Sequence, residues 1–397
     1  MLRILTLASL FPDVSRPVFG VFVERQTLGL AARDDVDLTV IAPLGIPPWP
    51  LARHPRYRAL AQLPRLENWK GLTVHRPRFP VIPGGKGLSS AALLARAVLP
   101  LARRLHAHKP FDLIDAQFFF PDGPAAMRIA QALGLPFSVK ARGADIHHWG
   151  HQRWTAGEVR AAGMAADGLL AVSAAMKRDM VALGIAPEKI RVHYTGVDLD
   201  AFHPGDRATL KAEMGFDSGP LIASVGALIP RKGQKLLIEA LVALPRATLA
   251  LAGQGPDRGA LEALARERGV AGRVHFLGNI PHEALPHLLA AADVMALPSA
   301  SEGLANAWVE ALACGTPIVI SSAGGAAELF DRPEAGRIVP REPLAIAGAI
   351  AELLADPPEA EAVRATAGRF TWAANSAALF DHLSGLKRRQ AAPLSYD

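Results

Sequence analysis

The 397-residue sequence contains one cysteine, Cys314, and no apolar run that reaches about 18 residues. A single cysteine excludes a framework of intramolecular disulfides and favours a cytoplasmic protein. The missing apolar run argues against a transmembrane helix, and the short apolar start lacks the features of a signal peptide, so we expect a first β-strand there. Cys314 lies at the apolar end of an expected helix, which predicts a packed core thiol rather than a nucleophile.

Two further features are missing, a short-period repeat and a dinucleotide-binding fingerprint. Gly253 and Gly255 follow an expected strand, but Arg258 stands where the third glycine of that fingerprint would be. The sequence therefore disfavours a dehydrogenase. Hydrophobic residues make up 50% and charged residues 20% of the chain, as in an ordinary soluble protein that is long enough for two domains.

Positive charge is concentrated in the first part of the chain. Residues 1–110 contain 16 Lys and Arg against 6 Asp and Glu, a surplus of ten, while the whole chain carries +6. Such a region attracts lipid headgroups, phosphorylated substrates or nucleic acid, and a merely solvated Arg-rich surface is an equal alternative. A nucleic-acid-binding surface would be expected to carry stacking aromatic residues, and this region has only the scattered Trp49, Tyr57 and Trp69.

Short apolar runs alternate with helical patterns in two successive series. This alternation predicts an α/β protein with two doubly wound parallel sheets, separated by a polar joint rich in Gly and Pro at residues 198–220. We expect domains at residues 1–200 and 201–368 and a last helical segment at 369–397. The expected strands are residues 2–9, 37–43, 111–117, 136–143, 168–173 and 190–196 in the first series, and 221–227, 247–253, 273–278, 293–299, 316–321 and 336–340 in the second.

Two glutamates, Glu302 and Glu310, flank the start of an expected helix at residues 306–313. The free backbone N–H groups of such a helix form a natural seat for a phosphate. Glu302 lies in the preceding loop, and Glu310 lies one turn inside the helix, where its carboxylate could accept two hydroxyl protons of a sugar. This arrangement suggests a nucleotide sugar, although a solvated loop and a helix-face charge would produce the same spacing.

A second strand-to-helix loop carries two adjacent cations, Arg231 and Lys232, which suit a diphosphate. The loop that contains Gly253 and Gly255 allows close approach of the backbone to a nucleotide.

Six stretches together resemble the retaining glycosyltransferases of family four, which have the GT-B fold. The stretch SEGLANAWVEALACGTPIV, with LLAAADVMALPSASEG running into it, matches their motif of two glutamates separated by seven residues. The other stretches are similar to the family's N-terminal loop, its interdomain block and its further blocks in the same order: FPDVSRPVFGVFVERQ, YTGVDLDAFHP, VGALIPRKGQ, LAGQGPDRGALE and VHFLGNI. The similarity covers nearly the whole chain and is most specific at residues 220–330. It implies two Rossmann-like domains that face each other across a cleft.

The resemblance also implies roles for individual residues. Arg231 and Lys232 look like the pair that neutralises the donor diphosphate as it leaves. Glu310 looks like the ribose ligand, and Glu302 looks like the glutamate beside the donor sugar. The donor side would also include Gly20, Gly253, Gly255, Ile280, Gly303, Leu304, Ala305 and Asn306.

The chain departs from the family pattern in the segment Arg142-Gly143-Ala144-Asp145. Much of the family has a histidine where Arg142 stands, so a histidine-centred mechanism is disfavoured. Arg142 and Asp145 become candidates for the acceptor or sugar side. The turn Leu304-Ala305-Asn306 is similar to the turn of a subgroup of the family that has Asn there and is found among enzymes of cell-surface polysaccharides.

Two patterns imitate metal sites. Asp198 and Asp200 resemble the Asp-x-Asp motif of the other glycosyltransferase fold, but they lie in the interdomain joint. His147 and His151 are spaced as zinc ligands, without the intervening glutamate of a zinc protease or a third ligand. We therefore expect neither a metal nor a cofactor.

These observations predict a retaining glycosyltransferase that moves a sugar from a nucleoside-diphosphate sugar to a glycan or lipid-linked acceptor in polysaccharide or glycolipid synthesis. The expected location is the cytoplasm, with peripheral association at the inner face of an anionic membrane and no nucleic-acid partner. Two alternatives remain open, a nucleotide-sugar epimerase of the same fold and a non-catalytic protein that binds sugar nucleotides or nucleic acid.

Overall fold

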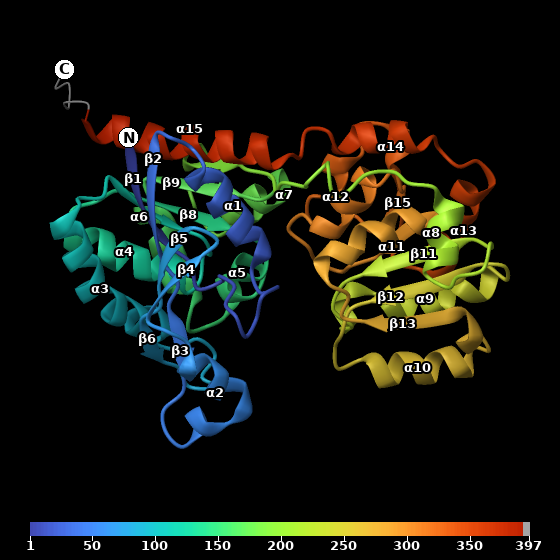
Figure 1. The fold of residues 1–397 in the computed structure, drawn as a ribbon, viewed down its shortest axis with the longest axis horizontal. Coiled ribbons are helices and arrows are strands. Elements are labelled where there is room, and N and C mark those ends of the chain that lie inside the picture. Colours follow the sequence, from blue (N-terminus) through green and yellow to red (C-terminus); the bar gives the residue numbers. More distant parts are fainter. Residues whose placement is uncertain (392–397) are drawn as a thin grey trace. The chain divides into compact units, whose positions relative to one another are not determined.

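The computed structural model describes residues 1–391, apart from the side chains of Arg56 and of residues 389–391, and forms two compact units (Figure 1). Unit 1 contains residues 1–194 together with the C-terminal segment from Trp372, and unit 2 contains residues 195–371. Each unit is an α/β structure built on one large sheet, as the alternation of strands and helices predicts.

The sheet of unit 1 has eight strands in the order β10-β9-β8-β7-β1-β2-β5-β4. All neighbours are parallel except β4, which runs antiparallel to β5. Every residue of β7, β8 and β9 is buried, which explains why these strands are mostly apolar, with Asp115 and Lys140 as buried exceptions. The strands of this unit are β1 (Leu2–Leu7), β2 (Val36–Ile41), β3 (Leu44–Ile46), β4 (Leu66–Trp69), β5 (Leu72–His75), β6 (Arg78–Pro80), β7 (Leu113–Ala116), β8 (Phe137–Ala141), β9 (Gly168–Ala171) and β10 (Ile190–Val192).

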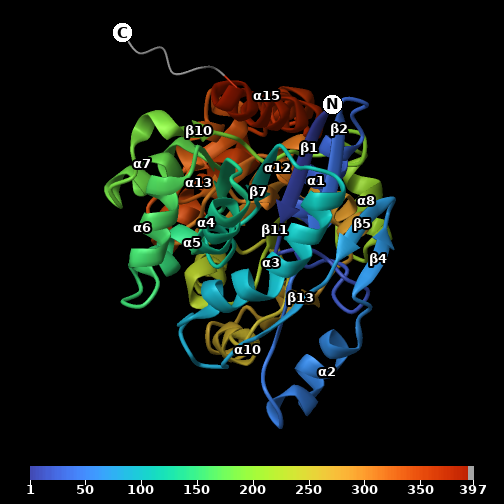
Figure 2. The ribbon, with the colours of Figure 1, turned by 90° about the vertical axis from the view of Figure 1, so that its left-hand side faces the viewer.

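Helices cover this sheet, and their apolar side chains belong to separate clusters. Leu94 of α3 and Ile129 of α4 belong to one cluster, whereas Leu30 of α1 and Leu379 and Leu383 of α15 belong to the other. Helix α15 therefore packs beside α1, although the two helices lie near opposite ends of the sequence (Figures 1 and 2). The helices of unit 1 are α1 (Val21–Ala31), α2 (Pro55–Gln62), α3 (Ser90–His108), α4 (Asp122–Leu133), α5 (Ala144–His147), α6 (Ala156–Ala165), α7 (Ala174–Ala182) and α15 (Trp372–Ala391).

The sheet of unit 2 has six parallel strands in the order β13-β12-β11-β14-β15-β16. Helices α9, α10 and α13 contribute Leu237, Leu261 and Ile350 to its main apolar cluster. Outside that cluster, α12 holds the fully buried Trp308. The elements are β11 (Leu221–Val225), β12 (Thr248–Ala252), β13 (Val274–Gly278), β14 (Val294–Leu297), β15 (Ile318–Ile320) and β16 (Gly336–Ile338), with α8 (Arg207–Glu213), α9 (Gln234–Ala240), α10 (Arg258–Glu267), α11 (Leu285–Ala291), α12 (Asn306–Ala313), α13 (Pro343–Ala355) and α14 (Ala360–Ala367).

The chain crosses between the units a few residues away from the expected boundaries after residues 200 and 368. Residues 195–200 belong to unit 2 because they are bonded to its last segment. The Val197 N–H donates to the Phe370 carbonyl at 2.6 Å, and the Arg364 guanidinium donates to the Leu199 carbonyl at 2.7 Å. Most of the expected last helical segment at 369–397 forms α15, which starts at Trp372 and belongs to unit 1, and residues 392–397 lie outside the described residues.

Residues 44–80 form short elements that the sequence analysis did not assign. They comprise β3, α2, β4, β5 and β6, and Figure 2 shows α2 projecting from the rest of unit 1. These strands have three or four residues, which is too short for a clear alternation of apolar and polar side chains. Within residues 1–391, no helix combines the length and the apolar character needed to span a membrane.

Candidate functional site

The predicted phosphate-binding loops of unit 2 leave two neighbouring strands, β11 and β14. From β11 the chain proceeds to β12 and β13 on one side, and it then returns to the other side of β11 with β14. The loops after β11 and β14 therefore diverge at a topological switch point, where α/β sheets bind ligands. The first of these loops carries Arg231 and Lys232, and the second carries Glu302.

These three side chains form one charged cluster. The Glu302 carboxylate accepts a hydrogen bond from Lys232 Nζ at 2.5 Å, and Arg231 Nη1 lies 3.3 Å from the same oxygen. Glu302 is buried, the Lys232 side chain is 14% exposed and the Arg231 side chain is 45% exposed. Two cations share one carboxylate, so the cluster, which we call the switch-point triad, retains one net positive charge.

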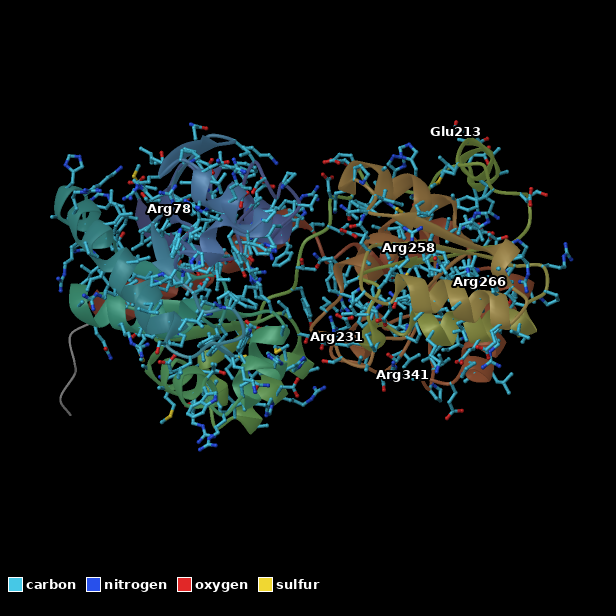
Figure 3. The ribbon with its side chains drawn as sticks, turned by 90° about the horizontal axis from the view of Figure 1, so that it is seen from below. Arg78, Glu213, Arg231, Arg258, Arg266 and Arg341 are labelled. Carbon is cyan, nitrogen blue, oxygen red and sulfur yellow. The ribbon has the colours of Figure 1, made fainter. Side chains whose placement is uncertain are left out.

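Glycines bring the loops of the triad together. Gly233 has φ +80°, and a Cβ there would lie 2.5 Å from the Pro298 carbonyl oxygen. The Ala300 N–H donates to the Arg231 carbonyl at 2.7 Å, which joins the two loops directly. Arg341, labelled with Arg231 in Figure 3, donates from Nε to the Pro298 carbonyl at 2.9 Å.

Helix α12 begins directly after the triad. Its N-cap residue, Ala305, is extended, and in this described region no side chain caps the helix. The first backbone N–H groups of α12 lack intrahelical acceptors, as in any helix, and they are suited to an anion. Ala305 and Asn306 are partly exposed, whereas Leu304 is buried and the Gly303 carbonyl accepts the Gly325 N–H at 2.7 Å.

Glu310 lies on the second turn of α12 and is bonded to a histidine that the sequence analysis did not single out. His282 Nε2 lies 3.0 Å from Glu310 Oε1 and makes an edge contact with the Phe202 ring. Nothing in the spacing of His282 and Glu310, 28 residues apart, indicates this pair. Ile280, half-buried after β13, precedes His282 by two residues.

The two glycines after β12 contact the backbone of the neighbouring loop. A Cβ on Gly253 would lie 2.0 Å from the Gly226 carbonyl oxygen, and one on Gly255 would lie 2.1 Å from that of Leu228. Close packing of two loops of the protein is therefore enough to require glycine at both positions.

In the same unit, burial raises the pKa of the Cys314 thiol to about 12, with the Glu310 charge as the second cause, which fits a packed core thiol.

In unit 1, Arg142 follows β8 and is held by a glutamine. Its guanidinium donates to the Gln117 carbonyl and to Gln117 Oε1, both at 2.6 Å, and lies over the Phe22 ring at 5.0 Å. Burial lowers the pKa of Arg142 to about 10, so the guanidinium still carries its charge at neutral pH. A fixed cation thus occupies the position where the family commonly has histidine.

Asp145 and Gly20 shape the loops in which they lie. The Asp145 carboxylate is buried and accepts the N–H groups of Gly143 at 2.7 Å and Phe119 at 2.9 Å. A Cβ on Gly20, which has φ +71°, would lie 2.5 Å from the Leu10 carbonyl oxygen.

A buried polar network surrounds Arg142. Lys140 Nζ bonds His193 Nδ1 at 2.6 Å and Gln26 Oε1 at 2.8 Å, and burial lowers the pKa of both Lys140 and His193. Burial also raises the pKa of Asp115 to about 6 and that of Asp122 to about 7. Asp115 and Lys140 lie near the carboxyl ends of β7 and β8, and His193 directly follows β10, so the polar core of unit 1 is at the ligand-binding edge of its sheet.

Two of the residues that imitate metal sites, Asp198 and His147, have other partners. Asp198 Oδ1 accepts the N–H groups of Asp200 and Ala201, and His147 Nε2 lies 2.8 Å from Asp179 Oδ2. Across residues 1–391, no group of three or more His, Cys, Asp or Glu is placed to hold a metal ion.

Two family profiles match successive parts of the chain. The profile of glycosyl transferases group 1 matches residues 206–370, and that of glycosyltransferase family 4 matches residues 20–201. The chain belongs to the group 1 glycosyltransferases. Its two units have the GT-B fold, since 99% of the chain superimposes on all of sucrose-phosphate synthase from Thermosynechococcus elongatus, with a TM-score of 0.81 and 22% identity.

This glycosyltransferase also resembles curated proteins. It is 29% identical to the putative teichuronic acid biosynthesis glycosyltransferase TuaC of Bacillus subtilis, over 88% of each chain. It is 38% identical to a GDP-mannose-dependent alpha-(1-6)-phosphatidylinositol monomannoside mannosyltransferase of Mycolicibacterium smegmatis, over 49% of this chain and 56% of that one. The match thus spans little more than half the length of the mycobacterial relative.

The raised pKa of Asp122 predicts a pH dependence of stability. Between the ordinary value of 3.8 and the folded value of about 7, the unfolded chain binds fewer protons at this site than the folded protein. The free energy of unfolding therefore falls as pH rises through this interval, by up to about 1.4 kcal/mol per pH unit. Asp122→Asn keeps an acceptor for the Ser9 N–H and has no proton to lose, so we expect a flatter profile.

Denaturant unfolding at several pH values tests this expectation, with Asp34→Asn, a change of an exposed carboxylate, as the control. Asp115 is present in the wild type and in both variants, so its contribution to the pH dependence of the free energy of unfolding is the same in all three proteins. Parallel profiles for the wild type and Asp122→Asn would contradict the assignment.

Proposed function

We propose that this glycosyltransferase moves a sugar from a nucleoside-diphosphate sugar to a glycan or lipid-linked acceptor, with retention of configuration, in the synthesis of a cell-surface polysaccharide or glycolipid. The observation that carries this proposal is the switch-point triad of Arg231, Lys232 and Glu302 beside the N-terminus of α12. The relatives in teichuronic acid and phosphatidylinositol mannoside synthesis support the same class of pathway.

The donor diphosphate takes the place of Glu302 as the partner of the two cations. The triad carries a net positive charge, and the N–H groups of α12 add positive potential, so a diphosphate gains charge-assisted hydrogen bonds there. Glu302, released from the cations, is then free to contact the donor sugar. Because the relative in M. smegmatis is GDP-mannose-dependent, GDP-mannose is the first donor to test.

Glu310 binds the ribose of the donor. His282 holds Oε1 of Glu310 in a hydrogen bond, which orients the carboxylate and leaves its second oxygen for a hydroxyl group. His282 is therefore a positioning residue in this proposal.

Departure of the nucleoside diphosphate places additional negative charge on its terminal phosphate. Lys232, Arg231 and the start of α12 stabilise that charge in the transition state, which is electrostatic catalysis without a need for a metal or other cofactor. A nucleotide-sugar epimerase would use a similar site. Release of nucleoside diphosphate that depends on an acceptor distinguishes the transferase from it.

Unit 1 receives the acceptor. Arg142, a fixed cation at the ligand-binding edge of the sheet, supplies positive charge to an anionic group of the acceptor or the donor. Asp145 and Gly20 maintain the loops on this edge. The basic surplus of residues 1–110 holds the protein at the cytoplasmic face of an anionic membrane.

Arg231→Ala and Lys232→Ala should each lower turnover by two orders of magnitude or more, because lost charge stabilisation costs about 3 kcal/mol. Steady-state transfer from a nucleotide sugar measures this effect, circular dichroism checks the fold, and the exposed Arg246→Ala is the matched control. Near-normal turnover in the double variant would refute the role of the pair.

A chelator should leave transfer unchanged, and complete loss of transfer would revive a metal site at Asp198 and Asp200.

Glu310→Gln should weaken binding of the free nucleoside diphosphate, whereas Glu302→Gln should preserve binding and impair transfer. The reason is that Glu310 contacts the ribose, while Glu302 reaches the sugar. Calorimetry with the nucleoside diphosphate separates the two, and His282→Ala should change binding in the same direction as Glu310→Gln. Equal effects of the two glutamate variants would contradict this division.

Reversal of Arg53, Arg56 and Arg58 to glutamate should weaken binding to anionic liposomes, to which each basic residue near the surface contributes about 1 kcal/mol. This segment also exposes Trp49 and Leu51, and the side chain of Arg56 lies outside the described residues. The measurement is co-sedimentation with anionic and neutral liposomes at low salt and near 1 M salt, where the Debye length is about 3 Å.

The control carries the same change of charge on unit 2, at the exposed Arg246, Arg266 and Arg332; Figure 3 labels Arg266. Equal binding to both types of liposome, or no binding to either, would indicate a soluble acceptor and a solvated basic surface.

A further inference from the structure

Unit 1 contains a second candidate site, a cavity of about 390 Å³ between the β4–β5 hairpin and helix α3. Its size is within the range of pockets that bind small molecules. The cavity lies far along the sheet order from β8, which precedes Arg142. Its walls include Arg65, His75, Arg76, Pro100, Leu101 and Arg104.

Three of these residues are arginines with little negative charge near them. Within the described part of the chain, Arg65 and Arg104 form no ion pair. Arg76 is buried, and its Nε donates to Glu67 Oε1 at 2.6 Å while its Nη2 donates to the Pro12 carbonyl at 2.6 Å. Among the three arginines, only Arg76 is paired with a carboxylate, that of Glu67.

The buried guanidinium of Arg76 also has an unused donor. Its Nη1 is buried and has no hydrogen-bond partner among the described residues. A buried donor without an acceptor costs free energy, and so does the repulsion among three cations around one cavity. An anion in the cavity would offset both costs.

The cavity also has an appropriate position in the fold. His75 is the last residue of β5 and pairs in parallel with Ile41, the last residue of β2, so the cavity opens at the carboxyl edge of the sheet. Burial, and secondly the Arg104 charge, lower the pKa of His75, which keeps the imidazole neutral at pH 7. Pro100 and Leu101 add apolar surface to the wall of the same cavity.

We propose that this cavity binds the phosphate group of a phosphorylated ligand, either a soluble molecule or the headgroup of a lipid. Arg65 and Arg104 bond the phosphate from opposite walls, the hairpin and α3, while the buried Arg76 supplies charge from the base. The inference does not depend on the donor site, because all these residues lie in unit 1.

Arg65→Gln/Arg104→Gln tests the proposal, and Arg96→Gln/Arg103→Gln is the matched control. Both pairs remove two exposed positive charges, but Arg96 and Arg103 of α3 do not line the cavity. Both are introduced into Arg231→Ala/Lys232→Ala protein, so that phosphate bound at the donor site does not contribute. The measurement is calorimetric titration with inorganic phosphate at low salt.

We expect Arg65→Gln/Arg104→Gln to weaken phosphate binding roughly tenfold or more, and the control pair to change it less than about twofold. Equal losses in the two pairs would show non-specific attraction and overturn the site. Undetectable phosphate binding in the parent protein, or unchanged binding in Arg65→Gln/Arg104→Gln, would also overturn it.

Vesicles of phosphatidylcholine with and without phosphatidylglycerol identify the source of the phosphate. If the ligand is a lipid headgroup, Arg65→Gln/Arg104→Gln reduces binding to the anionic vesicles more than the control pair does, and inorganic phosphate competes. If the ligand is soluble, both pairs bind vesicles equally while the difference in phosphate binding remains.

Discussion

The contact of Glu302 with Lys232 and Arg231 depends on a feature of chain topology, the divergence of two loops at the switch point between β11 and β14. Two cations and a carboxylate seventy residues away become neighbours because parallel strands end at one edge of the sheet. In the free protein the carboxylate compensates one of the two positive charges of the loop. The same charge is available to a diphosphate, which offers more acceptor oxygens than a carboxylate does.

Glycines set how closely the chain approaches itself around this contact. Gly233 lies against the Pro298 carbonyl, Gly253 against Gly226, and Gly324 against the Glu302 carbonyl, with distances that leave no room for a Cβ. These close approaches fix how the loops that carry the triad pack against each other. Preorganised charge is the property that electrostatic catalysis requires.

Unit 1 uses its polar residues differently. Around Arg142, the buried side chains of Lys140, His193 and Gln26 bond each other, so the guanidinium is held from inside the protein. In the cavity beside α3, by contrast, Arg65 and Arg104 have no ionic partner in the described chain. The same type of side chain is thus a structural element in one place and an available binding group in the other, and its partners make the difference.

Most of the buried strands could be predicted because a parallel strand covered on both faces is a nearly continuous apolar run. Helix α12 has the bounds that its pattern predicts, since Gly315 and Pro317 end it clearly. The short edge elements at residues 44–80 could not be predicted, because a strand of three or four residues has no measurable period and is stabilised by its neighbours.

The sequence by itself determined the fold class and predicted a set of donor-site residues, because strand periodicity, helix ends and the spacing of Glu302 and Glu310 are local properties of the chain. Only the tertiary structure decided which side chains meet. His282 and Glu310, and likewise Gln117 and Arg142, come from distant segments and form hydrogen bonds. The three arginines around the cavity also come from separate elements. Contacts of this kind follow from strand order and helix packing, which local sequence patterns do not encode.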